Sequence, residues 1–125
     1  MVVRLRPVLL TLAVCLLAAC IIHVSDIWRH GWLPYRFAPL PLNVYWTSLA
    51  FFDALAAFLL VVSPRIGLFL ALLIITSDVS LNLFARFGLG LHLRPLALLL
   101  QIVFFVAVVT TIVCGQRTGA ITRTI

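Results

Sequence analysis

Residues 44–84 read VYWTSLAFFDALAAFLLVV, then SPR, then IGLFLALLIITSDVSLNLF. Two apolar runs, 44–62 and 66–84, are therefore separated by only three residues. Each run is close to the roughly 20 residues that a helix needs to cross a bilayer core. Neither run shows the alternation of a membrane β-strand. Because three residues cannot carry the chain back across a membrane, we expect the two runs to form a tight hairpin of antiparallel helices.

Two further apolar runs lie on either side of this hairpin, at 8–24 and 96–114. Three of the four runs are preceded by a proline, namely Pro7, Pro64 and Pro95. A proline costs a helix nothing at its first turn, because the N–H it lacks would have no partner there. The sequence thus predicts an all-α fold, an integral membrane four-helix bundle with short connections, in which residues 1–125 form a single transmembrane domain.

One longer loop is expected at residues 25–43, SDIWRHGWLPYRFAPLPLN. Its tryptophan, tyrosine and phenylalanine side chains suit the membrane–water interface, and its three prolines oppose a long helix. We expect this loop to lie on the bilayer surface, with Asn43 capping the helix that follows. Residues 115–125 are expected to form a short flexible tail.

The composition indicates that lipid surrounds most of the chain. Of its 125 residues, 65% are hydrophobic and 10% are charged. The mean hydropathy is +1.27. Soluble domains have about 25% charged residues, because a small protein needs a large polar surface. The lipid bilayer is therefore the first partner we expect, in an integral protein of a bacterial-type inner (plasma) membrane.

The basic residues are all arginines, and they give a net charge of +6. They lie at the chain ends and between the apolar runs, so they resemble interfacial anchors rather than the basic patch of a nucleic-acid binder. With a cytoplasmic N-terminus, five arginines would lie inside and four outside. This small excess favours both termini in the cytoplasm.

The first run has a competing interpretation. Leu17-Ala18-Ala19-Cys20 resembles the cleavage site of a bacterial lipoprotein signal, which would remove the residues before Cys20. The apolar run continues through Ile21, Ile22 and Val24, however, where a mature lipoprotein usually becomes polar. We therefore favour a retained helix.

Two of the three acids in the chain, Asp53 and Asp78, lie inside apolar runs. A carboxylate at the centre of a membrane helix costs about 2.5 to 3.5 kcal/mol on insertion scales. With a rise of about 1.5 Å per residue, the two acids differ in depth by only about 4 to 5 Å on neighbouring helices. A polar site shared by the two acids is therefore geometrically allowed. It would hold a ligand or a proton, or the acids would only form hydrogen bonds between helices.

Other polar residues accompany the two acids. Asn82 lies four residues after Asp78, on the same helix face, and Gln101 is expected at a similar depth on the fourth helix. Asn82 and Gln101 complete the candidate site. Four residues are expected to support it: Ser77, Ser80, Trp46 and Arg86.

No motif points to a metal, a cofactor or an enzymatic reaction. The three cysteines form no CxxC pair, and the histidines His23, His30 and His92 are widely spaced. We expect no metal site, no cofactor and, on balance, no enzymatic activity.

Three functions remain open. The sequence favours a non-enzymatic membrane subunit or scaffold, as a homo-oligomer or with a membrane-protein partner, in which the polar residues only join helices. The alternative is a small carrier or lipophilic-ligand binder that uses Asp53 and Asp78. A membrane enzyme acting on a lipidic or quinone-like substrate ranks third.

Overall fold

The computed structural model describes residues 5–117 and 119, and within them the chain is all-α. Four helices follow one another: α1 (Leu5–His30), α2 (Leu40–Val62), α3 (Pro64–Leu83) and α4 (Pro95–Arg117). One π-helical turn, η1 (Phe84–Gly88), extends α3. Each of the four helices is long and apolar enough to cross a membrane. The predicted four-helix bundle is confirmed.

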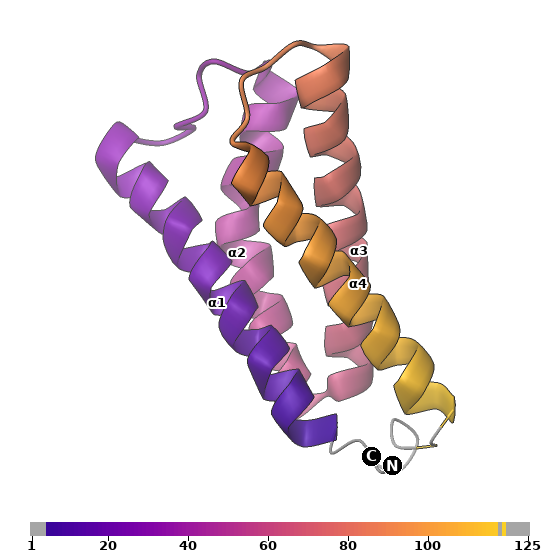
Figure 1. The fold of residues 1–125 in the computed structure, drawn as a ribbon. Coiled ribbons are helices and arrows are strands. Elements are labelled where there is room, and N and C mark those ends of the chain that lie inside the picture. The colour runs from indigo at the N-terminus through magenta and orange to yellow at the C-terminus, as the bar shows by residue number, and fades with distance from the viewer. Residues whose placement is uncertain (1–4, 118, 120–125) are drawn as a thin grey trace.

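The helices run alternately up and down (Figure 1). The start of α1, the α2–α3 turn and the end of α4 lie at one end of the bundle, and the α1–α2 and α3–α4 connections lie at the other. Helix α2 packs against both α1 and α3, and α4 packs mainly against α3. The hairpin expected from the three-residue link is therefore present, with α2 and α3 as antiparallel neighbours.

The α1–α2 connection is shorter than predicted. Helix α1 continues to His30 and α2 begins at Leu40, so the loop spans residues 31–39 instead of 25–43. Apolar runs mark the membrane-crossing part of a helix, and both helices extend past it. Pro41 does not oppose the helix because it lies in the first turn of α2, where proline is tolerated.

The predicted capping role of Asn43 is wrong for the same reason, since Asn43 lies inside α2. Its side chain instead binds the backbone of the loop. Asn43 Oδ1 accepts a hydrogen bond from the Tyr35 N–H at 3.0 Å, and Asn43 Nδ2 donates to the Leu33 carbonyl at 3.0 Å. Leu33 has a φ of 55°, a left-handed conformation that these two bonds help to hold.

The last two helices also extend beyond their predicted limits. Helix α3 begins at Pro64, before the expected 66, and α4 covers Pro95–Arg117 instead of 96–114. Residues 115–117 of the predicted tail are thus helical. Apart from residue 119, the remainder of that tail lies outside the described residues.

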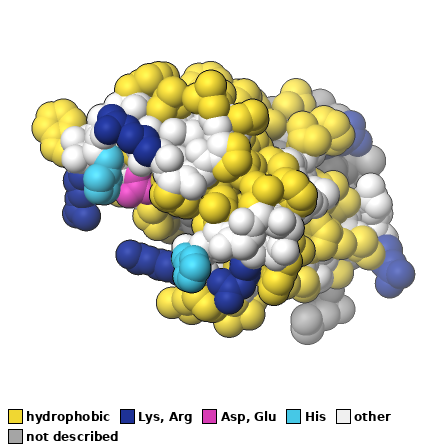
Figure 2. All heavy atoms as spheres, turned by 90° about the horizontal axis from the view of Figure 1, so that it is seen from above, with side chains coloured by type: hydrophobic (Ala, Val, Ile, Leu, Met, Phe, Trp, Pro, Cys, Tyr) yellow, Lys and Arg dark blue, Asp and Glu magenta, His cyan; other side chains and the backbone are white. Residues whose placement is uncertain are grey.

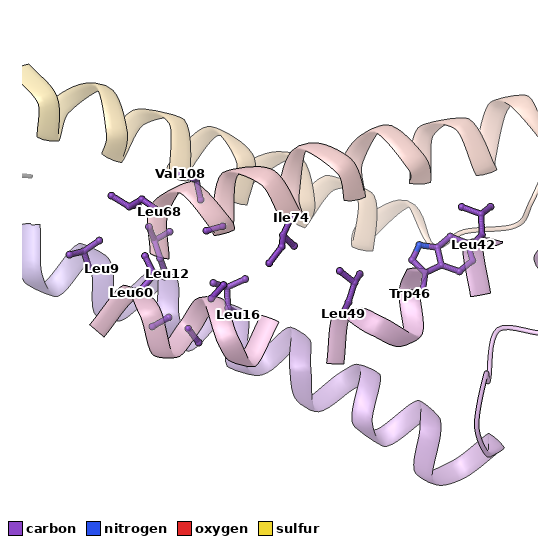
Figure 3. Packing of buried hydrophobic residues seen from close by; sticks show 14 of the residues in the cluster. Leu9, Leu12, Leu16, Leu42, Trp46, Leu49, Leu60, Leu68, Ile74 and Val108 are labelled. Carbon is purple, nitrogen blue, oxygen red and sulfur yellow. The ribbon is translucent and has the colours of Figure 1, made fainter. Parts of the chain in front are cut away.

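The α2–α3 hairpin is closely packed because its contact residues are small. A Cβ added to Gly67 of α3 would lie 2.6 Å from the Leu59 carbonyl carbon of α2 and would also collide with the Leu60 backbone. Ala57 and Ala71 are buried beside this contact. Larger side chains such as Leu60, Leu68 and Ile74 fill the core on either side (Figure 3). The small residues therefore permit the close helix contact that holds bundles together in lipid.

Large apolar side chains cover the outside of the bundle. Phe51, Phe58 and Phe69 are each more than half exposed, as are many leucine, isoleucine and valine residues on all four helices. A soluble protein rarely exposes so much contiguous apolar surface. This surface, together with the four apolar helices, is compatible with an integral membrane protein.

Arginine and histidine side chains gather at the end that carries the connections, as the view from above shows (Figure 2). Arg29, Arg36 and Arg94 are exposed there. Charged groups at the end of an apolar bundle suit the headgroup region of a bilayer.

Candidate functional site

Asn82 is the centre of a polar network that joins three helices. Its side-chain Oδ1 accepts a hydrogen bond from the Trp46 indole N–H of α2 at 2.8 Å. Its Nδ2 donates to Asp78 Oδ1 at 3.1 Å, within α3, and to Gln101 Oε1 of α4 at 2.9 Å. The structure therefore brings together Asp78, Asn82, Gln101 and Trp46, four residues of the candidate site.

The members of this network are shielded from the surroundings. Asn82 is 7% exposed, Asp78 is 8% exposed and Trp46 is 6% exposed. The Asn82 side-chain amide accepts one hydrogen bond through its oxygen and donates two through its nitrogen, so it bonds to groups on α2, α3 and α4. Amide groups with all partners in place fix the relative position of helices, so this part of the site has an evident structural role.

The two predicted supporting serines differ. Ser77 lies within 2.8 Å of the Tyr45 hydroxyl, which gives α2 and α3 a second polar contact. Ser80 is exposed, and its hydroxyl donates to the Thr76 carbonyl of its own helix at 2.7 Å. Ser77 is thus adjacent to the site, whereas Ser80 does not take part in it.

Arg86 does not act as a counter-ion for the two acids. Its Nη1 donates to the Leu93 carbonyl at 2.6 Å, and its guanidinium lies 5.7 Å from the Phe87 ring centroid. Throughout the described part of the chain, no arginine or histidine forms an ion pair with Asp53 or Asp78. Arg86, which was expected to support the site, is therefore bonded outside it, to the backbone of the α3–α4 connection.

Asp53 is buried deeply but has no hydrogen-bond donor. Its side chain is 3% exposed, and within residues 5–117 no group donates a hydrogen bond to its carboxyl. It interacts electrostatically with Asp78 of α3, Tyr45 of α2 and Cys20 of α1. The Cys20 thiol is directed elsewhere, to the Ala50 carbonyl at 3.1 Å. Asp53 is thus a deeply buried acid of α2 that interacts electrostatically with Asp78 of α3, and its oxygens receive no hydrogen bond within the described residues.

A second polar cluster, at the end with the connections, was not predicted. The Tyr35 hydroxyl donates to Asp26 Oδ2 at 2.9 Å and lies 2.7 Å from His23 Nδ1. Because Tyr35 gives its only proton to Asp26, its oxygen accepts the hydrogen bond from the His23 N–H. Burial, followed by the bond to Asp26, raises the pKa of Tyr35 well above its usual range, so the hydroxyl stays protonated.

This second cluster contacts the first through two aromatic rings. The Tyr35 ring packs edge-on against Trp46 at 5.6 Å between centroids. Through its hydrogen bond from Tyr35, the third acid of the chain, Asp26, attaches the loop to α1. No regular spacing marks this contact in the sequence, since it depends on how the loop folds back.

The described residues contain no group of three His, Cys, Asp or Glu side chains that could hold a metal ion. The chemistry available at Asp53 and Asp78 is therefore that of carboxyl groups in apolar surroundings. They can bind a proton, a cation or a hydrogen-bond donor.

The fold and the site define a class of protein: a small all-α bundle with four helices able to span a membrane and two acids buried between them. The chain was also compared with protein-family models, curated proteins and solved structures, and nothing in them matches it.

Proposed function

We propose that this protein is a small, non-enzymatic membrane carrier or ligand binder that uses the Asp53–Asp78 region as its binding site. The observation that carries the proposal is the Asp53 carboxyl, which is 3% exposed and has no hydrogen-bond donor within residues 5–117. A residue that only joined helices would use its oxygens in a bond between helices, as Asn82 does.

The cost of burying the Asp53 carboxyl supports a ligand. Burying a carboxylate without a partner is costly enough that it must be neutralised, by a proton or by a cation. Asp53 and Asp78 are both buried, on the adjacent helices α2 and α3, and they interact electrostatically, so a charge on one acid makes a charge on the other more costly. Ionisable groups retained inside a membrane generally mark binding sites or ion pathways.

A second candidate function is a membrane subunit or scaffold, alone or with a membrane-protein partner. The fully bonded Asn82 network favours it, because such a network stabilises helix packing without any ligand.

In either case we propose an inner (plasma) membrane location of the bacterial type with both termini in the cytoplasm. The even number of helices and the five arginines assigned to that side by sequence support this orientation.

The two functions can be separated by replacing each acid with leucine. If Asp53 is a binding residue, Asp53→Leu should leave the free energy of unfolding in lipid unchanged or raise it. Asp78→Leu should lower that free energy by about 1 kcal/mol, because Asn82 loses an acceptor. Unfolding followed by circular dichroism in bicelles measures both values.

Carbodiimide labelling provides the functional measurement. Dicyclohexylcarbodiimide enters lipid and reacts with protonated carboxyls, so mass spectrometry should find the label on Asp53 in membranes at neutral pH. Asp53→Asn is the control that removes the labelled group. A stability loss for Asp53→Leu together with an unlabelled Asp53 would show that the residue is structural and would contradict the proposal.

A further inference from the structure

We infer that the end of the bundle with the connections carries a binding surface for anionic phospholipid headgroups, at the place where the loop brings Arg36 back to the end of α1. This Arg29–Arg36 surface consists of Arg29, His30 and Arg36, flanked by Trp28 and Trp32. The inference is independent of the proposed binding function inside the bundle. It assigns a preference among lipids to named residues, which anchoring at a membrane interface alone does not require.

The loop holds Arg36 in a fixed place. Tyr35, the residue before it, is bound on two sides: Asn43 Oδ1 accepts a hydrogen bond from its backbone N–H at 3.0 Å, and its hydroxyl donates to Asp26 Oδ2 at 2.9 Å. A hydrogen bond of 3.1 Å from the Ala38 N–H to the Tyr35 carbonyl closes the turn that contains Arg36. The position of Arg36 relative to α1 and α2 is therefore set by bonds on both of its neighbouring helices.

The Arg36 guanidinium lies beside the basic residues that end α1. A Cβ added to Gly31 would be 3.9 Å from Arg36 Nη2, and Gly31 directly follows Arg29 and His30, the last two residues of α1. The φ of Gly31 is 83°, a left-handed conformation that is common in the residue after a helix. Figure 2 shows arginine and histidine side chains gathered at this end of the bundle. Residues seven apart in sequence are thus neighbours in the fold.

This end of the bundle has too few acids to neutralise its arginines. Among the described residues, four arginines and one acid, Asp26, lie there, which gives a net charge of +3 with the histidines neutral. Asp26 accepts the hydrogen bond from Tyr35 and forms no ion pair within residues 5–117. Arg86 donates to the Leu93 carbonyl. The other three arginines have no acceptor in the described part of the chain, namely Arg29, Arg36 and Arg94.

The aromatic side chains beside the surface indicate that its anion belongs to a lipid. Trp28 is 90% exposed and Trp32 is 73% exposed. Tryptophan is enriched at the headgroup level of a bilayer, because its ring is apolar and its N–H is polar. The two rings therefore place the Arg29–Arg36 surface at the depth of the lipid phosphates. A guanidinium binds a phosphate through two parallel N–H donors.

The charge of the headgroup determines which lipid is preferred. A zwitterionic lipid offers the same phosphate as an anionic one, but its ammonium group brings a positive charge to an end of the bundle that is already positive. An anionic headgroup brings no such charge. Basic residues near a membrane surface attract anionic lipids for this reason. The surface should therefore select an anionic phospholipid over a zwitterionic one with the same acyl chains.

The opposite end of the bundle supplies a matched comparison. Three exposed arginines of the described chain lie there, one at the start of α1, one in the first turn of α3 and one at the end of α4: Arg6, Arg65 and Arg117. None of the three tryptophans of the chain accompanies them. Removal of two arginines at either end changes the net charge equally, so the two ends can be compared directly.

The test is native mass spectrometry of the full-length protein with dioleoylphosphatidylglycerol, which is anionic, and dioleoylphosphatidylcholine, which is zwitterionic. Titration of each lipid into the detergent-solubilised protein gives the Kd of the first bound lipid. The variant Arg29→Gln with Arg36→Gln alters the surface, and Arg65→Gln with Arg117→Gln is the control. Circular dichroism checks that each variant retains its helices.

The unaltered protein should bind phosphatidylglycerol about five-fold or more tightly than phosphatidylcholine. Arg29→Gln with Arg36→Gln should lower this preference below about two-fold, whereas the control pair should leave it unchanged. Arg29→Lys with Arg36→Lys keeps both charges and should retain most of the preference, so the test stands even where the glutamine pair does not fold. An excess of inorganic phosphate should not displace the bound phosphatidylglycerol.

Three results would overturn the inference. One is equal affinity of the unaltered protein for the two lipids. Another is an equal loss of preference in the two glutamine pairs, which would mean that arginines at either end act alike. The third is displacement of phosphatidylglycerol by inorganic phosphate, which would assign the surface to a soluble anion. Carbodiimide labelling tests Asp53 separately, so either proposal can fail without the other.

Discussion

Asp53 and Asp78 occupy similar positions on adjacent helices, yet their surroundings differ. Asp78 lies at one edge of a network in which Asn82 donates to it and also joins Trp46 and Gln101. Asp53 is more deeply buried, at 3% against 8% exposed, and has no donor within the described residues. Burial alone therefore does not distinguish the two acids. The distribution of hydrogen-bond donors around them does.

The difference also explains why the bundle tolerates the two acids. The Asn82 network and the close α2–α3 contact at Gly67 provide favourable packing and bonding. Asp53 depends on that framework without contributing a hydrogen bond to it. Substitutions in the framework should consequently affect stability, and those at Asp53 should affect binding.

The largest effect is expected for Gly67→Ala, which breaks the framework itself. The added Cβ meets the backbone of Leu59 and Leu60, which cannot move aside without separating α2 from α3. We expect a loss of about 3 kcal/mol in the free energy of unfolding, measured in bicelles by circular dichroism.

Gly88→Ala is the control for this change. Its added Cβ meets only the exposed Phe84 side chain, which can rotate, so the expected loss is about 0.5 kcal/mol or less. Similar losses for the two alanine variants would show that the α2–α3 contact at Gly67 is not tight.

A smaller effect is expected for Asn82→Ala, which removes the centre of the network. Three hydrogen bonds disappear, and Trp46, Asp78 and Gln101 each lose a partner, so the loss should be about 2 kcal/mol. Gln101→Ala removes only one of these bonds and should cost about 0.6 kcal/mol by the same measurement. Equal costs for the two variants would mean that Asn82 is not the central residue.

An effect as small as that of Gln101→Ala is expected for Trp46→Phe, which keeps an aromatic ring in the core but removes the N–H donor to Asn82. A loss of about 0.6 kcal/mol is expected, together with weaker protection of the Asn82 side-chain amide protons from exchange in NMR spectra. Trp28→Phe is the matched control, since Trp28 is 90% exposed and should be neutral. An unchanged amide signal would argue against the indole–amide bond.

The fold could be predicted from sequence because lipid imposes a simple rule. A chain that exposes apolar side chains all round a run of about 20 residues has few other solutions, and the three-residue link forces α2 and α3 together. The proximity of Asp78, Asn82, Gln101 and Trp46 followed from depth and helix periodicity. Depth and periodicity are properties of regular helices, and in a regular helix the spacing of residues determines which side chains share a face.

The rest depended on contacts outside the regular helices. Arg86 was expected to support the site, but the connection beyond η1 presents the Leu93 carbonyl to it. The predicted loop is longer than the observed one because, in sequence, the polar ends of α1 and α2 resemble loop residues. The bonds of Tyr35 to Asp26 and His23 depend on the path of residues 31–39, which no periodic pattern encodes.

That short loop has a mechanical consequence. Asn43 of α2 binds the loop backbone, and Tyr35 of the loop binds Asp26 near the end of α1. A tilt of α2 should therefore be transmitted through the loop to α1. At the opposite end, the Gly67 contact clamps α2 to α3. Helix α4 is the least buried of the four and is fastened by neither clamp. Any rigid-body motion within the bundle should therefore change the position of α4 relative to α1, α2 and α3, which move together.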